Sequence, residues 1–206
     1  MRYRIYVSLV CLLLGLLVAC QSDKGKQAGS QQQPIQSNTT NQSNTTKQLP
    51  SGQLTYVAPE GWVKQQPSSS MRKDQYALPG VDGAGDGEMV VFFFPGAGGG
   101  VEDNLKRWYG QFKQPDGSAT EEHVELKQVT ANNLPVTLAY VTGTYLQSTS
   151  PMMMGGPVEE RPDYSMLAAI VETAEAPWFF KATGPKKTID HWRPSFDAFV
   201  KTFRVE

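Results

Sequence analysis

Three stretches of different hydrophobic character follow one another along the chain. Residues 5–19 are almost continuously apolar, residues 21–51 are rich in Gln, Ser, Asn and Thr, and residues 52–206 mix apolar and polar positions in periodic patterns. A segment as polar as 21–51 cannot bury enough apolar surface to offset the entropy lost on ordering, so a disordered tether is predicted there. The last stretch has the length of a single domain.

Several segments of that last stretch have strand patterns. Residues 54–57 and, more weakly, 68–78 predict short strands. Residues 88–94 (Glu-Met-Val-Val-Phe-Phe-Phe) are rich in β-branched and aromatic residues and end at Pro95, which predicts a strong strand. Because both of its faces are apolar, we expect this strand to be central and covered on both sides.

Two hairpins are predicted farther along the chain. Residues 124–130 and 135–146 form the first, with a turn at Asn132-Asn133. Residues 164–173 and 178–183 form the second.

Two segments carry apolar residues at helical spacing. The first set comprises Val101, Leu105, Trp108 and Phe112, and the second comprises Ile189, Trp192, Phe196, Phe199, Val200 and Phe203. Spacings of three and four place each set on one face of a helix. The second helix is predicted to open at Gly184-Pro185, with Thr188 as an alternative N-cap, and to kink or restart at Pro194. Hairpin strands with such helices indicate an α+β fold, a largely antiparallel sheet with two amphipathic helices packed on it.

The apolar leader has the layout of a secretory signal peptide. Arg2 and Arg4 supply a cationic start, and the apolar run after them is shorter than the roughly 20 residues that a helix needs to span a bilayer. A cleaved leader over residues 1–19 is therefore predicted, rather than a permanent membrane span.

The end of the leader is a distinctive tetrapeptide, Leu17-Val18-Ala19-Cys20. It resembles the bacterial lipobox, which implies cleavage between Ala19 and Cys20 and a covalent lipid on the Cys20 sulfur. The alternative is a soluble secretory protein whose cleavage site happens to contain a cysteine. Under the lipobox prediction, residues 20–51 are a lipidated tether and residues 52–206 a single α+β domain.

The predicted lipid and the residue after it also indicate where in the cell the protein is located. Two or three acyl chains hold a protein firmly on a membrane, whereas a single chain does so only marginally. Gln21 stands where an aspartate would resemble the inner-membrane retention signal of proteobacteria. We therefore expect a lipid-anchored cell-envelope protein, with the outer membrane facing the periplasm favoured over the inner membrane.

Composition excludes several kinds of site. The chain has two cysteines, Cys11 in the leader and Cys20 at the predicted lipid, so no thiol is left for a disulfide or a metal-thiolate site. The formal net charge is −1 and becomes more negative when Arg2 and Arg4 leave with the leader. This argues against nucleic acid as a partner, and no cofactor beyond the lipid is predicted.

The histidines offer little catalytic chemistry. His123 stands beside Glu122 on a predicted strand and His191 beside Asp190 on the predicted last helix. No Gly-x-Ser-x-Gly motif occurs, and adjacent residues on a strand point to opposite faces. Two histidines without a free cysteine cannot readily supply a zinc site. We predict no catalytic residue and no metal, and a hydrolase built on either histidine is kept as an alternative.

A segment without periodicity, residues 147–162, contains three adjacent methionines. Long structureless loops tend to be functional or disordered. The thioethers suit a soft ion such as Cu(I), or an adaptable docking surface, and a merely variable loop is the third possibility. The candidate ligand or partner contacts are Met152, Met153, Met154, Arg107 and His191.

Short motifs at both ends of the last stretch carry a family resemblance. Residues 56–62 (Tyr-Val-Ala-Pro-Glu-Gly-Trp) and 196–203 (Phe-Asp-Ala-Phe-Val-Lys-Thr-Phe) resemble the ends of the PsbP-like superfamily, which includes the DcrB-like bacterial lipoproteins. Residues 104–112 and 180–185 are similar to uncharacterised secreted bacterial proteins. The resemblance implies a sheet with helices on its faces and a non-catalytic envelope role.

Together these features predict a lipid-anchored, non-enzymatic binding or scaffolding module with a possible envelope protein partner. A carrier of a small ligand or soft metal, using the methionine segment, is the main alternative.

Overall fold

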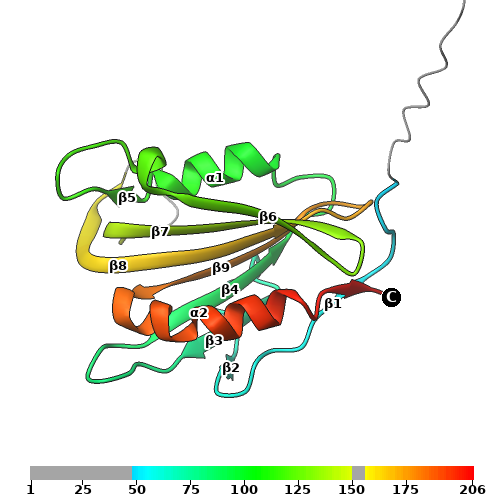
Figure 1. Ribbon diagram of the computed structural model, residues 1–206, viewed down its shortest axis with the longest axis horizontal. Coiled ribbons are helices and arrows are strands. Elements are labelled where there is room, and N and C mark those ends of the chain that lie inside the picture. Colours follow the sequence, from blue (N-terminus) through cyan, green and yellow to red (C-terminus); the bar gives the residue numbers. More distant parts are fainter. Residues whose placement is uncertain (1–47, 150–155) are drawn as a thin grey trace, which may run out of the picture. The chain divides into compact units, whose positions relative to one another are not determined.

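In the computed structural model, which describes residues 48–149 and 156–206, a large antiparallel sheet carries one helix on each face (Figure 1). Its strands run in the order β2-β3-β4-β9-β8-β7-β5, and β6 also pairs with β7. This arrangement confirms the predicted α+β class. The strands are β2 (Val63–Gln65), β3 (Asp74–Leu78), β4 (Gly87–Phe93), β5 (Phe112–Lys113), β6 (Glu125–Ala131), β7 (Leu134–Ser148), β8 (Val158–Val171) and β9 (Trp178–Pro185).

The two helices bury opposite faces of this sheet. Helix α2 (Lys186–Val200) packs in a cluster with Phe180, and helix α1 (Val101–Tyr109) packs in a second cluster with Phe179. Successive side chains of a strand point to opposite faces, so these two neighbouring phenylalanines of β9 supply one core each. The strong strand predicted over 88–94 is β4, which pairs with β3 and β9 inside the sheet.

Both predicted hairpins are confirmed. Strand β6 pairs with β7, and Asn132 and Asn133 lie between them with positive φ angles of 48° and 68°. Two consecutive residues with positive φ make the type I′ turn that matches the twist of antiparallel strands. Strand β8 pairs with β9 along eight residue pairs, from Tyr164 opposite Pro185 to Val171 opposite Trp178.

The two ends of the described domain are joined by a small separate sheet. Strand β1 (Leu54–Thr55) pairs with β10 (Arg204–Val205). Just before β1, the carbonyl of Pro50 accepts a hydrogen bond from the amide of Ala174 at 3.0 Å. The first predicted strand is thus present but shorter than expected.

Three details of the predicted helices are wrong. Helix α1 ends at Tyr109, and Phe112 lies in β5 opposite Tyr145, because the chain turns at Gly110. Thr188 is not an N-cap but lies within α2, where its buried hydroxyl donates to the carbonyl of Gly85 at 2.7 Å. Helix α2 continues past Pro194 as one helix and does not restart there.

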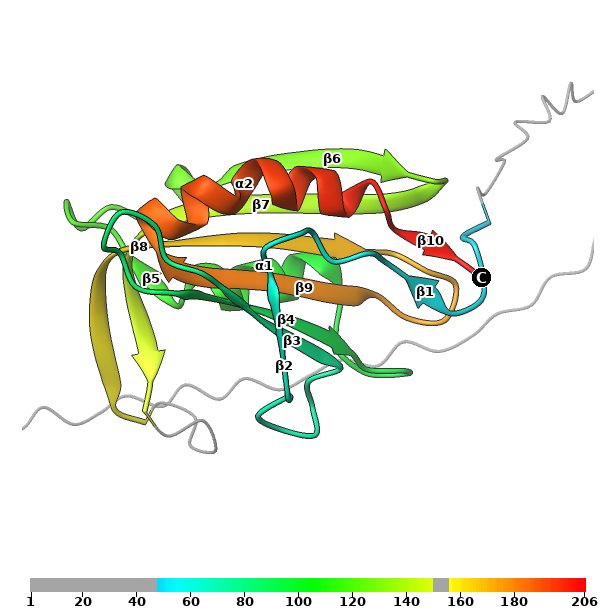
Figure 2. The ribbon, with the colours of Figure 1, turned by 90° about the horizontal axis from the view of Figure 1, so that it is seen from below.

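The described residues of the segment 147–162, which are 147–149 and 156–162, are mostly strand and not loop. Strand β7 extends to Ser148 and β8 begins at Val158, so much of the segment is paired strand. A register shift between Gly143 and Tyr145 interrupts the pairing, and beyond it the joined ends of β7 and β8 turn sharply away from the rest of the sheet (Figure 2). We call residues 144–148 with 158–164 the β7–β8 arm.

Candidate ligand-binding pocket

The sheet face that carries α1 is covered only in part. Trp108 of α1 packs edge-on against Phe179, with the ring centroids 6.2 Å apart. Beyond that contact, the same face of β3, β4 and β9 borders a cavity of about 610 Å³, closed on another side by the β7–β8 arm. We call it the sheet-face cavity.

Strand pairing sets the base of this cavity. Val90 of β4 lies opposite Lys181 of β9, and Glu88 lies opposite Thr183. All four line the cavity. Lys181 follows Phe179 by two residues, so its side chain is on the same face, one step beyond the part that α1 covers. A basic side chain therefore stands where the apolar core of that face ends.

Lys181 is half-buried and has a neutral partner. Its ammonium donates to the side-chain oxygen of Gln111 and lies 5.5 Å from the ring centroid of Tyr145. Within residues 48–149 and 156–206, no carboxylate forms an ion pair with it. Burial, with the nearby charge of Arg107, lowers the pKa of Lys181 from 10.5 to about 7. The lysine is thus poised between ammonium and amine at neutral pH.

Glu88, by contrast, is already well bonded. Its carboxylate accepts from the guanidinium of Arg72 at 2.8 Å and from the side-chain amide of Gln75 at 2.9 Å. Arg72 also donates to the amide oxygen of Gln75 at 3.0 Å. Gln75 is buried, so this three-residue network is held in place by the sheet.

The β7–β8 arm supplies an aromatic wall. Tyr145 and Tyr164 stack with their ring centroids 6.1 Å apart and an interplanar angle of 9°, and both line the cavity. Burial, followed by the charge of Glu88, raises the pKa of Tyr145, so its hydroxyl stays neutral at physiological pH. Two aromatic rings in parallel planes thus form this side of the cavity.

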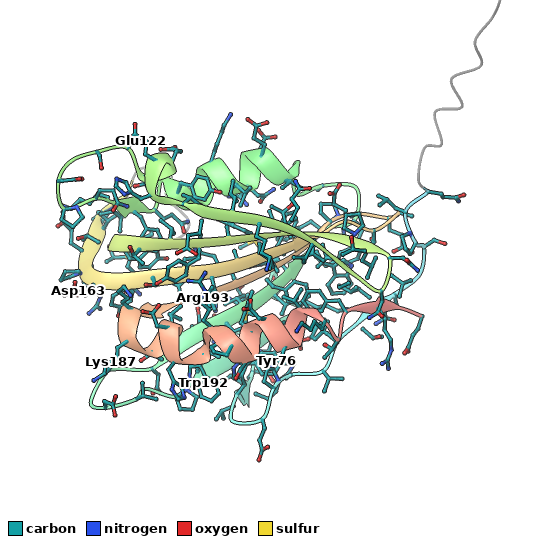
Figure 3. All side chains as sticks on the ribbon, in the orientation of Figure 1. Tyr76, Glu122, Asp163, Lys187, Trp192 and Arg193 are labelled. Carbon is teal, nitrogen blue, oxygen red and sulfur yellow. The ribbon has the colours of Figure 1, made fainter. Side chains whose placement is uncertain are left out.

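The structure separates two of the predicted contact residues. Arg107 is exposed on α1 and donates to the side chain of Asn104; its charge acts on Lys181, although it does not line the cavity. His191 is exposed on α2, on the other face of the sheet, and packs edge-on against Trp192 at 5.0 Å. From α2, Trp192 and Lys187 bond to the connection between β3 and β4 (Figure 3). Arg107 and His191 therefore cannot share a site.

The other predicted site residues fall outside the described part of the chain. Ala19 and Cys20 precede residue 48, and Met152, Met153 and Met154 lie within 150–155.

His123 lies in a short 3₁₀ helix, η1 (Thr120–His123), and not on a strand. Its Nε2 is 2.7 Å from the hydroxyl of Ser118, which donates to Asp116 at 2.6 Å. In a hydrolase triad the carboxylate orients the histidine, whereas here it bonds the serine, and both Asp116 and His123 are exposed. Nothing in this order of contacts activates the serine.

Residues 48–149 and 156–206 contain neither a candidate metal-binding cluster nor a helix that could span a membrane. Within them, no group of three or more His, Cys, Asp or Glu side chains is placed to hold a metal ion. No helix there is long and apolar enough to cross a membrane.

Lys181 was missed in the sequence because it lies inside a strong strand pattern. The run Trp178-Phe179-Phe180-Lys181-Ala182 places a charge on the same face as Phe179, where an apolar residue would be ordinary. A lysine in phase with buried residues is the pattern that could have identified it.

Replacing Lys181 with methionine is expected to stabilise the chain in a pH-dependent way. Because the pKa of Lys181 is lowered in the folded state, folding carries the full cost of the buried charge below pH 7, and this cost is relieved as the pH rises from 7 to 10.5. In urea unfolding at pH 6, the free energy of unfolding of Lys181→Met should exceed that of wild type by on the order of 1 to 3 kcal/mol. The difference should shrink by pH 10.

Lys127, which is exposed on β6, provides the control for this measurement. Lys127→Met should change the free energy of unfolding by less than about 0.5 kcal/mol at either pH. Equal stability of wild type and Lys181→Met at both pH values would show that the buried charge costs nothing.

Comparison with known proteins gives similarity to solved structures only. No protein-family model matches the chain, and no curated protein matches its sequence. A protein of unknown function from Pseudomonas aeruginosa aligns with a TM-score of 0.43 and 13% identity, over 75% of this chain and 99% of that one. The cyanobacterial PsbP (CyanoP) of Synechocystis sp. PCC 6803 aligns with a TM-score of 0.43 and 14% identity, over 74% of this chain and 86% of that one. At such scores neither similarity assigns a function to this chain.

Proposed function

We propose that this chain is a lipid-anchored cell-envelope protein whose folded domain binds a small solute in the sheet-face cavity without transforming it. The observation that carries the proposal is the cavity itself, about 610 Å³ in volume and lined by both aromatic and charged residues. Small-molecule sites are typically concavities of roughly 300 to 1,000 Å³, with apolar walls and a few fixed polar groups.

The construction of the cavity supports a binding role. Its base belongs to two paired strands, its charged side is fixed by the bonded network of Arg72, Gln75 and Glu88, and its aromatic wall is a stacked pair. Groups held in this way lose little conformational entropy when a ligand arrives. A site prepared in advance suits capture and release of a solute.

The anchor and tether complete the proposal. A lipid on Cys20 would hold the protein at the membrane, and a flexible coil of about 30 residues has a mean reach of roughly 30 Å. The folded domain would then sample solutes close to the membrane surface, in the periplasm.

A variant that fills the cavity tests the binding role. Thr183→Trp should occupy the base of the cavity, whereas Thr130→Trp places the same side chain on an exposed position of β6. The full chain, in detergent micelles, would be screened by thermal shift against small organic acids, amides, amines and sugars. A solute at 100 times its Kd should add about 2.7 kcal/mol to the free energy of unfolding.

We expect at least one solute to raise the melting temperature of wild type and of Thr130→Trp by several degrees, but not that of Thr183→Trp. Equal shifts in Thr183→Trp would place binding elsewhere, and the absence of any shift in wild type would argue against a solute-binding role.

A further inference from the structure

We infer that the solute of the sheet-face cavity is an aromatic carboxylate whose acid group pairs with the ammonium of Lys181, an inference that rests on the proposed function. Three features of the cavity support it. The charges around Lys181 are mostly positive, the stacked rings of Tyr145 and Tyr164 line the same cavity, and the hydrogen-bond partner of Lys181 is a neutral amide.

The charge around Lys181 is predominantly positive. Arg107 on α1 and Arg72 before β3 both act on the lysine as positive charges, and Glu88 on β4 is the one carboxylate among the groups that shift its pKa. Glu88 is already bonded by Arg72 and Gln75. An anion is therefore the group that this end of the cavity lacks.

Lys181 has hydrogen-bond donors left for such an anion. An ammonium has three donors, and one points to the neutral amide of Gln111. Across the strands, Lys181 is flanked by the small side chains of Val90 and Ala168. Neither side chain can accept a hydrogen bond from an ammonium, so neither competes with a carboxylate for the remaining donors of Lys181.

The wall beside the lysine favours a flat apolar group on the ligand. The stacked rings of Tyr145 and Tyr164 form one side of the cavity, and Phe92 and Val90 add apolar surface on β4. An aromatic ring offers the stacking and edge contacts that such a wall can make. A ligand with a ring and an acid group matches both ends of the cavity.

Binding should be coupled to the uptake of a proton. A carboxylate beside Lys181 favours the ammonium form, so the bound ligand raises the pKa of the lysine above its value of about 7 in the free protein. The other charged and titratable groups around Lys181 are Arg107, Arg72, Glu88 and Tyr145, and Asp86 also lines the cavity. Burial raises the pKa of Tyr145, so its hydroxyl does not compete for protons near pH 7. Affinity should therefore fall as the pH rises from 6 to 9.

The test compares benzoate with benzamide, which has nearly the same shape without the charge, and with inorganic phosphate, which has charge without a ring. Binding to the full chain would be measured by calorimetry at pH 6 and pH 9, in buffers with different ionisation enthalpies, so that proton uptake is measured directly. Wild type, Lys181→Met, Lys181→Arg and the control Lys127→Met would be compared.

In wild type and Lys127→Met, we expect benzoate to bind at least tenfold more tightly than benzamide or phosphate at pH 6. Benzoate should lose about tenfold or more in affinity by pH 9, and proton uptake should be measurable near pH 7. Lys181→Met should lose the preference for benzoate, and Lys181→Arg should keep the preference while losing the pH dependence and the proton uptake.

Two outcomes with bound benzoate overturn the inference and leave the proposed function intact. They are binding of benzamide at least as tightly as benzoate, and a pH dependence that survives in Lys181→Met. Failure of benzoate to bind, while another solute binds wild type and not Thr183→Trp, also overturns it. If no solute distinguishes wild type from Thr183→Trp, the proposed function itself fails.

Discussion

Replacing Phe180 with alanine is expected to lower the free energy of unfolding by about 3 to 5 kcal/mol. The ring of Phe180 is fully buried between the sheet and α2. Its centroid lies 4.5 Å from that of Phe203, 5.1 Å from that of Tyr56 and 5.6 Å from that of Phe199. The loss combines the transfer of a large apolar side chain with the cavity that its removal leaves in a close-packed core.

Denaturant unfolding followed by tryptophan fluorescence would measure this loss. Val63→Ala is the matched control, because Val63 is 53% exposed on β2 and should change stability by no more than about 0.5 kcal/mol. A loss below 1 kcal/mol in Phe180→Ala would mean that the core between α2 and the sheet is not packed as described.

Replacing Cys20 with serine is expected to move nearly all of the protein out of the membrane fraction, or to leave it unprocessed. Without the sulfur no diacylglycerol can be attached, and the remaining apolar leader is too short to act as an ordinary membrane span. Detergent phase separation of cell envelopes, followed by mass spectrometry of the amino terminus, would measure both outcomes.

Ser22→Ala is the matched control, because it changes a residue two positions from Cys20 and leaves the sulfur in place. This variant should be cleaved and should partition like wild type. If Cys20→Ser is still cleaved before residue 20 and partitions like wild type, the lipobox prediction is wrong and the protein is an ordinary secretory protein.

The fold was predictable where one periodicity dominates. The two helices follow from spacings of three and four because one face of each is buried, and β4 follows from a run of β-branched and aromatic residues that is apolar on both faces. Phe112 misled the helix prediction because its spacing fits a fourth turn, although Gly110 ends the helix first. The outer part of the β7–β8 arm, residues 147–148 and 158–163, was missed since residues such as Glu159 and Glu160 are exposed, and an exposed strand has no apolar alternation.

The pocket was less predictable than the fold. Arg107 was selected from the sequence and lies near the cavity, but His191 lies on the other face of the sheet. Lys181 and Tyr145 meet only because β7, β8 and β9 pair in one register and the arm bends at Gly143. Such a juxtaposition depends on long-range pairing, which local patterns do not contain.

The most direct test of solute binding is a residue-resolved NMR titration of the full chain with the solute found by thermal shift. We expect the largest shifts at the backbone amides of Val90, Lys181 and Thr183, and we expect them to disappear in Thr183→Trp but not in Thr130→Trp. Shifts confined to α2 or η1, or no shifts at saturating solute, would contradict this expectation.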